Sequence, residues 1–143
     1  MVISSMFFTE TAHAKTYKIG DIGPRGGVVF YVLDPETQSL WHYMEVSPNN
    51  WNQGKTSRLS FLNAGKRAYG YDNETWYIPA QEDMENIYKH RNILKRISFL
   101  SGKYWTSTGK YTFRDMSVID MRTGKVSIDR GDGMYMVRPV RYF

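Results

Sequence analysis

The sequence predicts an α+β domain in which helices pack on a mainly antiparallel sheet. A β-branched and aromatic run at 28–33 follows a glycine-rich turn, as the first strand of a hairpin does. A helix signal stands near the middle of the chain at 79–87, and short strand patterns separated by turn residues fill the C-terminal part. Strands grouped in this way, rather than alternating with helices, favour antiparallel pairing.

Length and composition fit a single domain. The chain has 143 residues, enough for one hydrophobic core, and 15% of them are aromatic, so large rings must serve both core and surface. The formal net charge of +5 indicates acidic partners such as a sulfated polysaccharide. Cysteine is absent, which excludes disulfides, thiolate zinc sites and cysteine nucleophiles.

The first 14 residues resemble the end of a signal peptide. Residues 12–14, Ala-His-Ala, match the small-x-small pattern that signal peptidase cleaves, and a polar texture starts at Lys15. We therefore expect a signal-peptide remnant at 1–14, one domain at 15–143, and export to the periplasm, the cell surface or the medium. The alternative is a chance Ala-x-Ala. No apolar run approaches the length that spans a bilayer, so no transmembrane segment is expected.

The first structural unit is predicted to be a β-hairpin. The run at 28–33 ends at turn residues 34–37, and a second strand pattern covers 40–46. The glycine-rich segment before it matches neither the P-loop nor the dinucleotide fingerprint, so tight turns are its expected use. His42 and Glu45 would lie on opposite faces of the strand, which argues against an acid–base or metal pair.

A loop-rich region follows at 47–75. An amphipathic stretch at 59–69 predicts a helix of two or three turns, limited by glycines. Trp51, Tyr69 and Tyr71 stand among polar residues here. Such rings either plug the core below a long loop, which is the more common case, or form an exposed binding surface.

The main helix is predicted from about 80 to 100. Pro79 suits a first helical turn, acidic side chains follow it, and apolar residues keep close to helical spacing as far as Ile97. Later strands are expected at 104–105, 112–121, 125–129 and 134–143, with a turn at 122–124.

The main helix and the segment after it form the most basic part of the chain. No Asp or Glu occurs between Asn86 and Arg114. Helical spacing would place Lys89, Arg96 and, less well, Lys103 on one outer face. The candidate contacts for a polyanion are Lys89, Arg91, Lys95, Arg96 and Lys103. The alternative is an ordinary solvated face.

Four motifs occur in order along the chain. They are IGDIGPRGGVVFY near the N-terminus, WYIPAQEDMENIY in the middle, then YWTST and VRPVR. Over residues 17–143 the chain thereby resembles the Lcl-type C-terminal domain family, the module that ends a bacterial collagen-like adhesin. The resemblance implies a C-type-lectin-like fold. In that fold the segment 17–33 would pair with 137–143, helices would lie near 57–68 and 80–97, and Trp76, Trp105 and Pro139 would belong to the scaffold.

The resemblance also bears on ligands and assembly. The adhesin of the family is associated with sulfated glycosaminoglycans and forms trimers, but this chain has no collagen repeat, so neither trimerisation nor the adhesin role carries over. The strings that usually mark lectin calcium sites are absent. Asp120, Asp129 and Asp132 offer oxygen ligands, but acidic residues at hairpin turns are usually solvated. No cofactor is expected, and calcium is the minor alternative.

Together these features favour a non-catalytic, exported module that binds an anionic glycan, such as a sulfated glycosaminoglycan, at the bacterial cell envelope. The alternative is an envelope protein-interaction module whose anchors are Trp51, Tyr69 and Tyr71. No nucleophile elbow, HExxH or related spacing supports an enzyme. Export would separate the basic surface from nucleic acid, which is therefore not an expected partner. The identity of the ligand and the oligomeric state stay open.

Overall fold

The computed structural model describes residues 15–55, 57–73, 75–94, 97–98, 102–110 and 112–143. The elements in chain order are β1 (Val28–Val32), β2 (Tyr43–Val46), the 3-10 turn η2 (Trp51–Gly54), α1 (Phe61–Tyr69), α2 (Gln81–Lys89), β3 (Lys103–Lys110), β4 (Thr112–Asp120), β5 (Val126–Arg130) and β6 (Val140–Tyr142). Two helices and two three-stranded antiparallel sheets thus make up the described part of the chain, which confirms the predicted α+β class.

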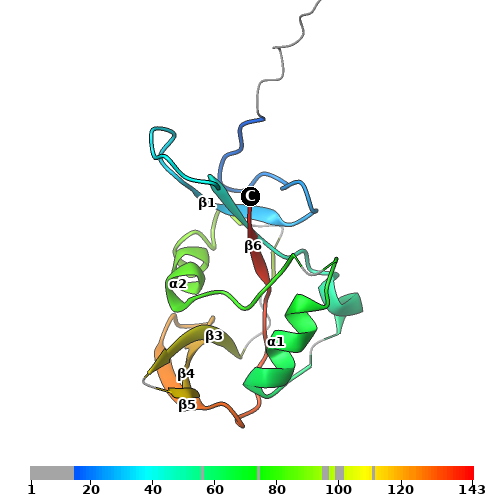
Figure 1. Cartoon of the computed structure of the whole chain (residues 1–143), viewed down its shortest axis with the longest axis vertical. Coiled ribbons are helices and arrows are strands. Elements are labelled where there is room, and N and C mark those ends of the chain that lie inside the picture. The colour runs from blue at the N-terminus through cyan, green and yellow to red at the C-terminus, as the bar shows by residue number, and fades with distance from the viewer. Residues whose placement is uncertain (1–14, 56, 74, 95–96, 99–101, 111) are drawn as a thin grey trace, which may run out of the picture.

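The two sheets lie at opposite ends of the molecule (Figure 1). The first has the strand order β1-β2-β6, and the second has the order β3-β4-β5. The predicted hairpin is confirmed, because β1 pairs with β2 and Val29 lies opposite Glu45. The predicted pairing of the N-terminal strand with the C-terminal strand is wrong. The hairpin places β2 between them, so β6 pairs with the other edge of β2, with Arg141 opposite Glu45.

Helix α1 begins at a side-chain cap formed by Ser60. The Ser60 hydroxyl accepts a hydrogen bond from the backbone N–H of Asn63 at 3.4 Å, as an N-cap side chain does. Ala64 and Ala68 are fully buried on one face, and Gly70 follows the last helical residue. The predicted helix within 59–69 is therefore confirmed.

Helix α2 begins as predicted but is much shorter than the expected 80–100. Its start is fixed by Asp83, whose carboxylate accepts the Ala80 N–H at 2.9 Å. The chain leaves the helix after Lys89 and forms hydrogen-bonded turns, although Leu94 and Ile97 still reach the core. The segment from His90 to Ile93 contains residues of modest helix propensity, and the turns bring the apolar side chains back to the sheet.

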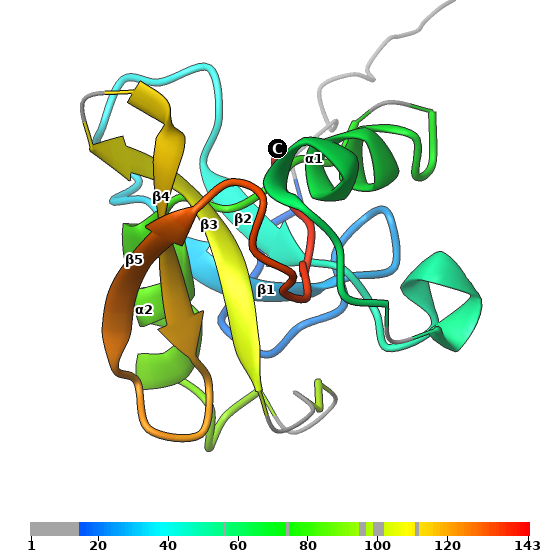
Figure 2. The same cartoon turned by 90° about the horizontal axis from the view of Figure 1, so that it is seen from below.

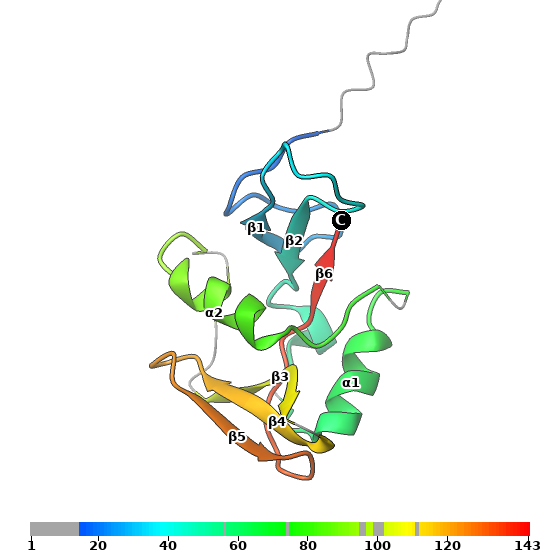
Figure 3. The same ribbon diagram turned by 60° about the vertical axis from the view of Figure 1, so that its left-hand side comes forward.

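The hydrophobic core has two parts, one next to each helix. Figures 2 and 3 show α1 and α2 on either side of the C-terminal segment that leads into β6. The first part joins β1, β2 and α2 with β4, and the second joins α1 and η2 with β3 and β4. Trp76 and Trp105 are fully buried and Pro139 is also buried, which confirms their predicted scaffold role.

Candidate ligand-binding site

A wide groove runs between η2 and α1, and we call it the basic groove. Its volume is about 790 Å³. Among the described residues that line it, Lys55, Lys66 and Arg67 are cationic and none is acidic. The further polar lining side chains are the amides of Asn50, Asn52, Gln53 and Asn63. The lining therefore combines positive charge with neutral hydrogen-bonding groups.

An unusual backbone turn forms one wall of the basic groove. Asn52 and Gln53 have φ values of 52° and 58°, and Gly54 follows with φ 74°. Residues other than glycine adopt this left-handed conformation only at an energetic cost. The Asn52 side chain accepts a hydrogen bond from Arg67 Nη1 at 2.8 Å and donates one to the Lys55 carbonyl at 3.3 Å. These bonds hold the turn against α1 and fix the width of the groove.

The aromatic candidates have different environments. Trp51 is only 7% exposed and contacts Tyr71, with ring centroids 5.9 Å apart, so the expected core-plug role is confirmed for Trp51. Tyr71 is half-buried and also lines the basic groove. Burial raises the pKa of its hydroxyl, which therefore stays a neutral hydrogen-bonding group. Tyr69 is 55% exposed on α1, so it does not plug the core.

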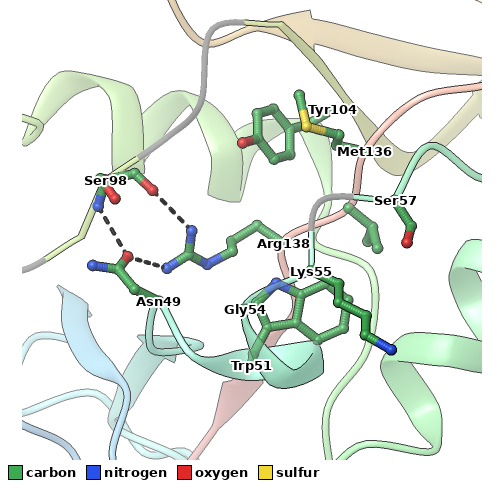
Figure 4. A pocket seen from close by; sticks show the side chains of 10 residues that line it. Asn49, Trp51, Gly54, Lys55, Ser57, Ser98, Tyr104, Met136 and Arg138 are labelled. Atoms are coloured by element: carbon green, nitrogen blue, oxygen red, sulfur yellow. Dashed lines mark hydrogen bonds between the residues drawn. The ribbon is translucent and has the colours of Figure 1, made fainter.

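A smaller hollow, the Arg138 pocket, is also lined by Trp51 and Lys55 (Figure 4). Its volume is about 190 Å³. Trp51 and Lys55 line both hollows, so the pocket and the basic groove are neighbours. The other described lining residues are Asn49, Gly54, Ser57, Ser98, Tyr104, Met136, Val137 and Arg138.

Arg138 forms the charged wall of this pocket. Its residue is only 5% exposed, and its guanidinium donates to the Ser47 carbonyl, the Ser98 carbonyl and Asn49 Oδ1 at 2.8–3.1 Å. Burial lowers the pKa of Arg138 to about 10, which leaves the group positively charged at neutral pH. The pocket therefore combines a buried positive charge with the rings of Trp51 and Tyr104.

Helix α2 ends at Lys89 and Lys103 begins β3, so the main helix does not place these two cations on one outer face as predicted. Arg91 lies in the turn after the helix, with its guanidinium 4.1 Å from the centroid of the Tyr88 ring. Lys103 is exposed at the start of β3. Lys95 and Arg96 lie outside the described residues. Lys89 and Arg91 remain exposed cations, but helical spacing does not align them with Lys103.

Glu45 is fully buried, unlike an ordinary strand residue. One carboxylate oxygen accepts the Gly27 N–H at 3.1 Å, and the other lies 3.4 Å from Arg141 Nη1. Burial raises the pKa of Glu45, although Gly27 and Arg141 oppose that shift. This arrangement attaches the glycine-rich segment to β2. Glu45 therefore has a structural role and does not line the basic groove.

The three aspartates considered as calcium ligands have separate partners. Asp120 forms an ion pair with Arg122 at 2.9 Å, and Asp132 lies 3.5 Å from Arg130. Asp129 accepts a hydrogen bond from the Tyr135 hydroxyl. Within the described residues, no three His, Cys, Asp or Glu side chains gather as a metal site would require.

The basic groove was not predicted from the sequence, because the cations that line it come from two separate segments. One available signal was the absence of Asp and Glu from 46 to 71, a stretch that contains Lys55, Arg58, Lys66 and Arg67. A second was the pair of cations in the last turn of α1. The spacing of residues in the sequence does not predict that η2 approaches the last turn of α1. That approach depends on the left-handed backbone at Asn52 and Gln53.

No protein-family model matches this chain, and neither does any curated protein. In the part of the chain that the structure describes, no helix has the length and apolarity needed to cross a membrane. The function must therefore be inferred from the basic groove, the Arg138 pocket and the sequence motifs.

Proposed function

We propose that the protein is a non-catalytic binding module for an anionic glycan, such as a sulfated glycosaminoglycan, at the bacterial cell envelope. The observation that carries this proposal is the basic groove, where Lys55, Lys66 and Arg67 stand among side-chain amides without an acidic neighbour in the described lining. Lysine and arginine bind sulfate and carboxylate groups, and the planar guanidinium can do so with two parallel hydrogen bonds. Amide groups can hydrogen-bond sugar hydroxyls.

The dimensions of the groove also suit a glycan chain. Its volume of about 790 Å³ lies within the range of about 300–1,000 Å³ that is common for ligand sites. The half-buried Tyr71 also lines the groove and would supply an aromatic ring beside a bound sugar. The hydrogen bond from Arg67 to Asn52 holds the walls in place before a ligand arrives, which reduces the entropy lost on binding.

The resemblance to the Lcl-type C-terminal domain family supports the same proposal. The α+β architecture, the two helices and the buried Trp76, Trp105 and Pro139 are compatible with the C-type-lectin-like fold that the resemblance implies. The proposal includes export of a single domain at 15–143 after removal of residues 1–14. Nucleic acid is not a proposed partner.

A protein-interaction module is the second candidate. Leu62 is 67% exposed and Tyr69 is 55% exposed, and both belong to α1. Their separation of seven residues places them on one side of the helix. An apolar pair on an exposed helix is a feature of protein-binding surfaces.

Retention on immobilised heparin across a salt gradient tests the first candidate. We expect the native chain to elute above physiological salt, and the double variant Lys66→Gln/Arg67→Gln to elute much earlier, because each lost cation removes one salt-sensitive contact. The matched variant Lys89→Gln/Arg91→Gln carries the same charge change outside the groove. It should elute close to the native chain.

Three other results would change the conclusion. Equal losses in both variants would mean that retention depends only on net charge. A loss confined to Lys89→Gln/Arg91→Gln would return the site to the basic segment after α2. Weak retention of all three proteins would favour the second candidate, for which Leu62→Ser/Tyr69→Ser should abolish partner binding with little dependence on salt.

A further inference from the structure

The Arg138 pocket has a size and chemistry that differ from those of the basic groove. Its volume of about 190 Å³ is below the range of about 300–1,000 Å³ in which drug-sized ligands bind, so it suits one small unit. Figure 4 shows Tyr104 and Met136 on one side of the Arg138 guanidinium and Trp51 on the other. Trp51, Tyr104 and Met136 are each only 3–8% exposed, so they give the pocket apolar walls and leave little ring surface for stacking.

The pocket also holds positive charge that solvent screens poorly. Arg138 is 5% exposed, and its contacts with Ser47, Ser98 and Asn49 fix the guanidinium at the pocket wall. A buried charge acts more strongly across a few ångströms than an exposed one, because the surrounding dielectric is lower. Lys55 adds a second cation and also lines the basic groove.

We propose that the Arg138 pocket binds a single acidic sugar unit at the end of the glycan, with its carboxylate or sulfate directed toward Arg138. This inference rests on the proposed function, since the rest of the glycan would continue from Lys55 along the basic groove. The protein would then recognise chain ends in preference to chain interiors. Carboxylate and sulfate share the required charge, and the experiments below separate them.

The first experiment uses monosaccharides, so it does not depend on the groove. Methyl glucuronide, methyl glucoside and methyl glucoside 6-sulfate are titrated into the full chain, and the side-chain NMR signals of Trp51 and Arg138 are followed. We expect saturable shifts with at least one of the two acidic glycosides and none with the neutral one. Comparison of the acidic pair identifies the preferred group. Equal responses to all three, or no response to any, would overturn the proposal.

The second experiment asks how the pocket and the groove are connected. A heparin hexasaccharide is compared with the same molecule after removal of the acidic groups from its non-reducing terminal unit. We expect this change to weaken binding by about tenfold, the effect of losing one charge-assisted contact. Ser57→Phe narrows the pocket without changing Arg138. It should weaken the native hexasaccharide to the level of the modified one and leave the modified one unaffected.

These outcomes separate the two proposals. If both hexasaccharides bind equally well, or if Ser57→Phe weakens both by the same factor, the end-recognition proposal fails while the proposed function stands. If neither hexasaccharide binds but an acidic monosaccharide does, the groove proposal fails and the pocket remains a site for an acidic sugar. Arg138→Gln serves as a supplementary variant only if its circular dichroism spectrum matches that of the native protein.

Discussion

Glu45 shows how one side chain determines which residues can surround it. Its carboxylate lies inside the core against the glycine-rich segment. A Cβ atom added at Gly23 would be 1.9 Å from Glu45 Oε2, so no other residue fits there without movement of the carboxylate. The glycines therefore provide space for a buried carboxyl group as well as tight turns.

The pH dependence of stability should reveal the buried carboxylate. Burial raises the folded-state pKa of Glu45 above its ordinary value of 4.5. The folded protein thus binds this proton more tightly than the unfolded chain does. The stabilising contribution is complete below the ordinary pKa and is lost as the pH rises through the raised pKa. We expect the free energy of unfolding of the native protein, minus that of Glu45→Gln, to fall as the pH rises over this window.

Urea unfolding of both proteins from about pH 4 to about pH 7 measures this difference. Other titrating groups, including Asp83, occur in both proteins and cancel. The variant also lacks the ion pair between Glu45 and Arg141. This loss adds a constant amount to the difference in the free energy of unfolding at the alkaline end of the window. A difference that rises with pH would show that the pairing with Arg141 outweighs burial.

Gly27 should be among the least replaceable residues. A Cβ atom at this position would lie 2.4 Å from the Val46 carbonyl oxygen and 3.0 Å from the Trp76 ring. We expect Gly27→Ala to lower the free energy of unfolding near the upper end of the range of about 1–3 kcal/mol for overpacking. Gly26→Ala is the matched control, because nothing lies within 4 Å and only its φ of +84° is unfavourable. A smaller loss at Gly27 than at Gly26 would contradict the steric argument.

The sequence predicted only part of this local arrangement. Turn residues and the strand at 28–33 were recognisable from composition. The contact of Gly27 with Glu45 joins residues 18 positions apart and depends on the pairing of β1 with β2. The burial of Glu45 could not be predicted because an alternating strand pattern does not reveal which charged residue faces inward.

At the level of elements, α1 is the helix that shapes the basic groove. Its interior glycine, Gly65, is a position where a substitution should increase stability. The Cβ of an alanine at Gly65 would lie 3.7 Å from Ile78 Cδ1, an ordinary contact. Gly65→Ala should therefore stabilise the protein by about 0.5–1 kcal/mol, since the unfolded chain loses freedom and the helix gains propensity. Chemical denaturation measures the change.

Ala64→Gly provides the opposite control in the same helix. It should destabilise the protein by about 1 kcal/mol or more, because Ala64 is fully buried and helical. Gly65 does not line the groove, so heparin retention of Gly65→Ala should equal that of the native chain. Reduced retention would indicate that binding requires movement of α1.

The two helices differ in how well the sequence predicted them. The amphipathic stretch at 59–69 and its glycines predicted α1 closely. The start of α2 was also readable from Pro79 and the acidic first turn. Its end was not, because Leu94 and Ile97 are buried both in an extended helix and in the observed turns. Periodicity alone cannot distinguish these two paths.

For the whole molecule, the C-terminal segment connects the two sheets. Met136 exchanges backbone hydrogen bonds with β3 near Lys103 and Trp105, whereas β6 pairs with β2. Detachment of this segment from one sheet would therefore also disturb the other sheet. We expect a single unfolding transition, in which tryptophan fluorescence and far-ultraviolet circular dichroism have the same midpoint.

Val140→Ala tests this connection from one end. Val140 is fully buried, and its truncation should lower stability by about 0.5–3 kcal/mol and move both signals together. Two separate midpoints in the variant would show that the sheets unfold independently. The class of fold was predictable from the grouping of strands, but this shared segment was not, since the strand at 134–143 was expected as one continuous element.

The contact between residues 17 and 143 also affects how the described domain can be attached to another protein. The Tyr17 ring lies 5.1 Å from the Phe143 ring, so the described chain leaves and returns at one place near the first sheet (Figure 1). A domain with adjacent ends can be inserted into a surface loop of another protein with little distortion of the host. Such a host protein would present this domain on its surface. Helix α1 and the basic groove would lie away from the point of attachment.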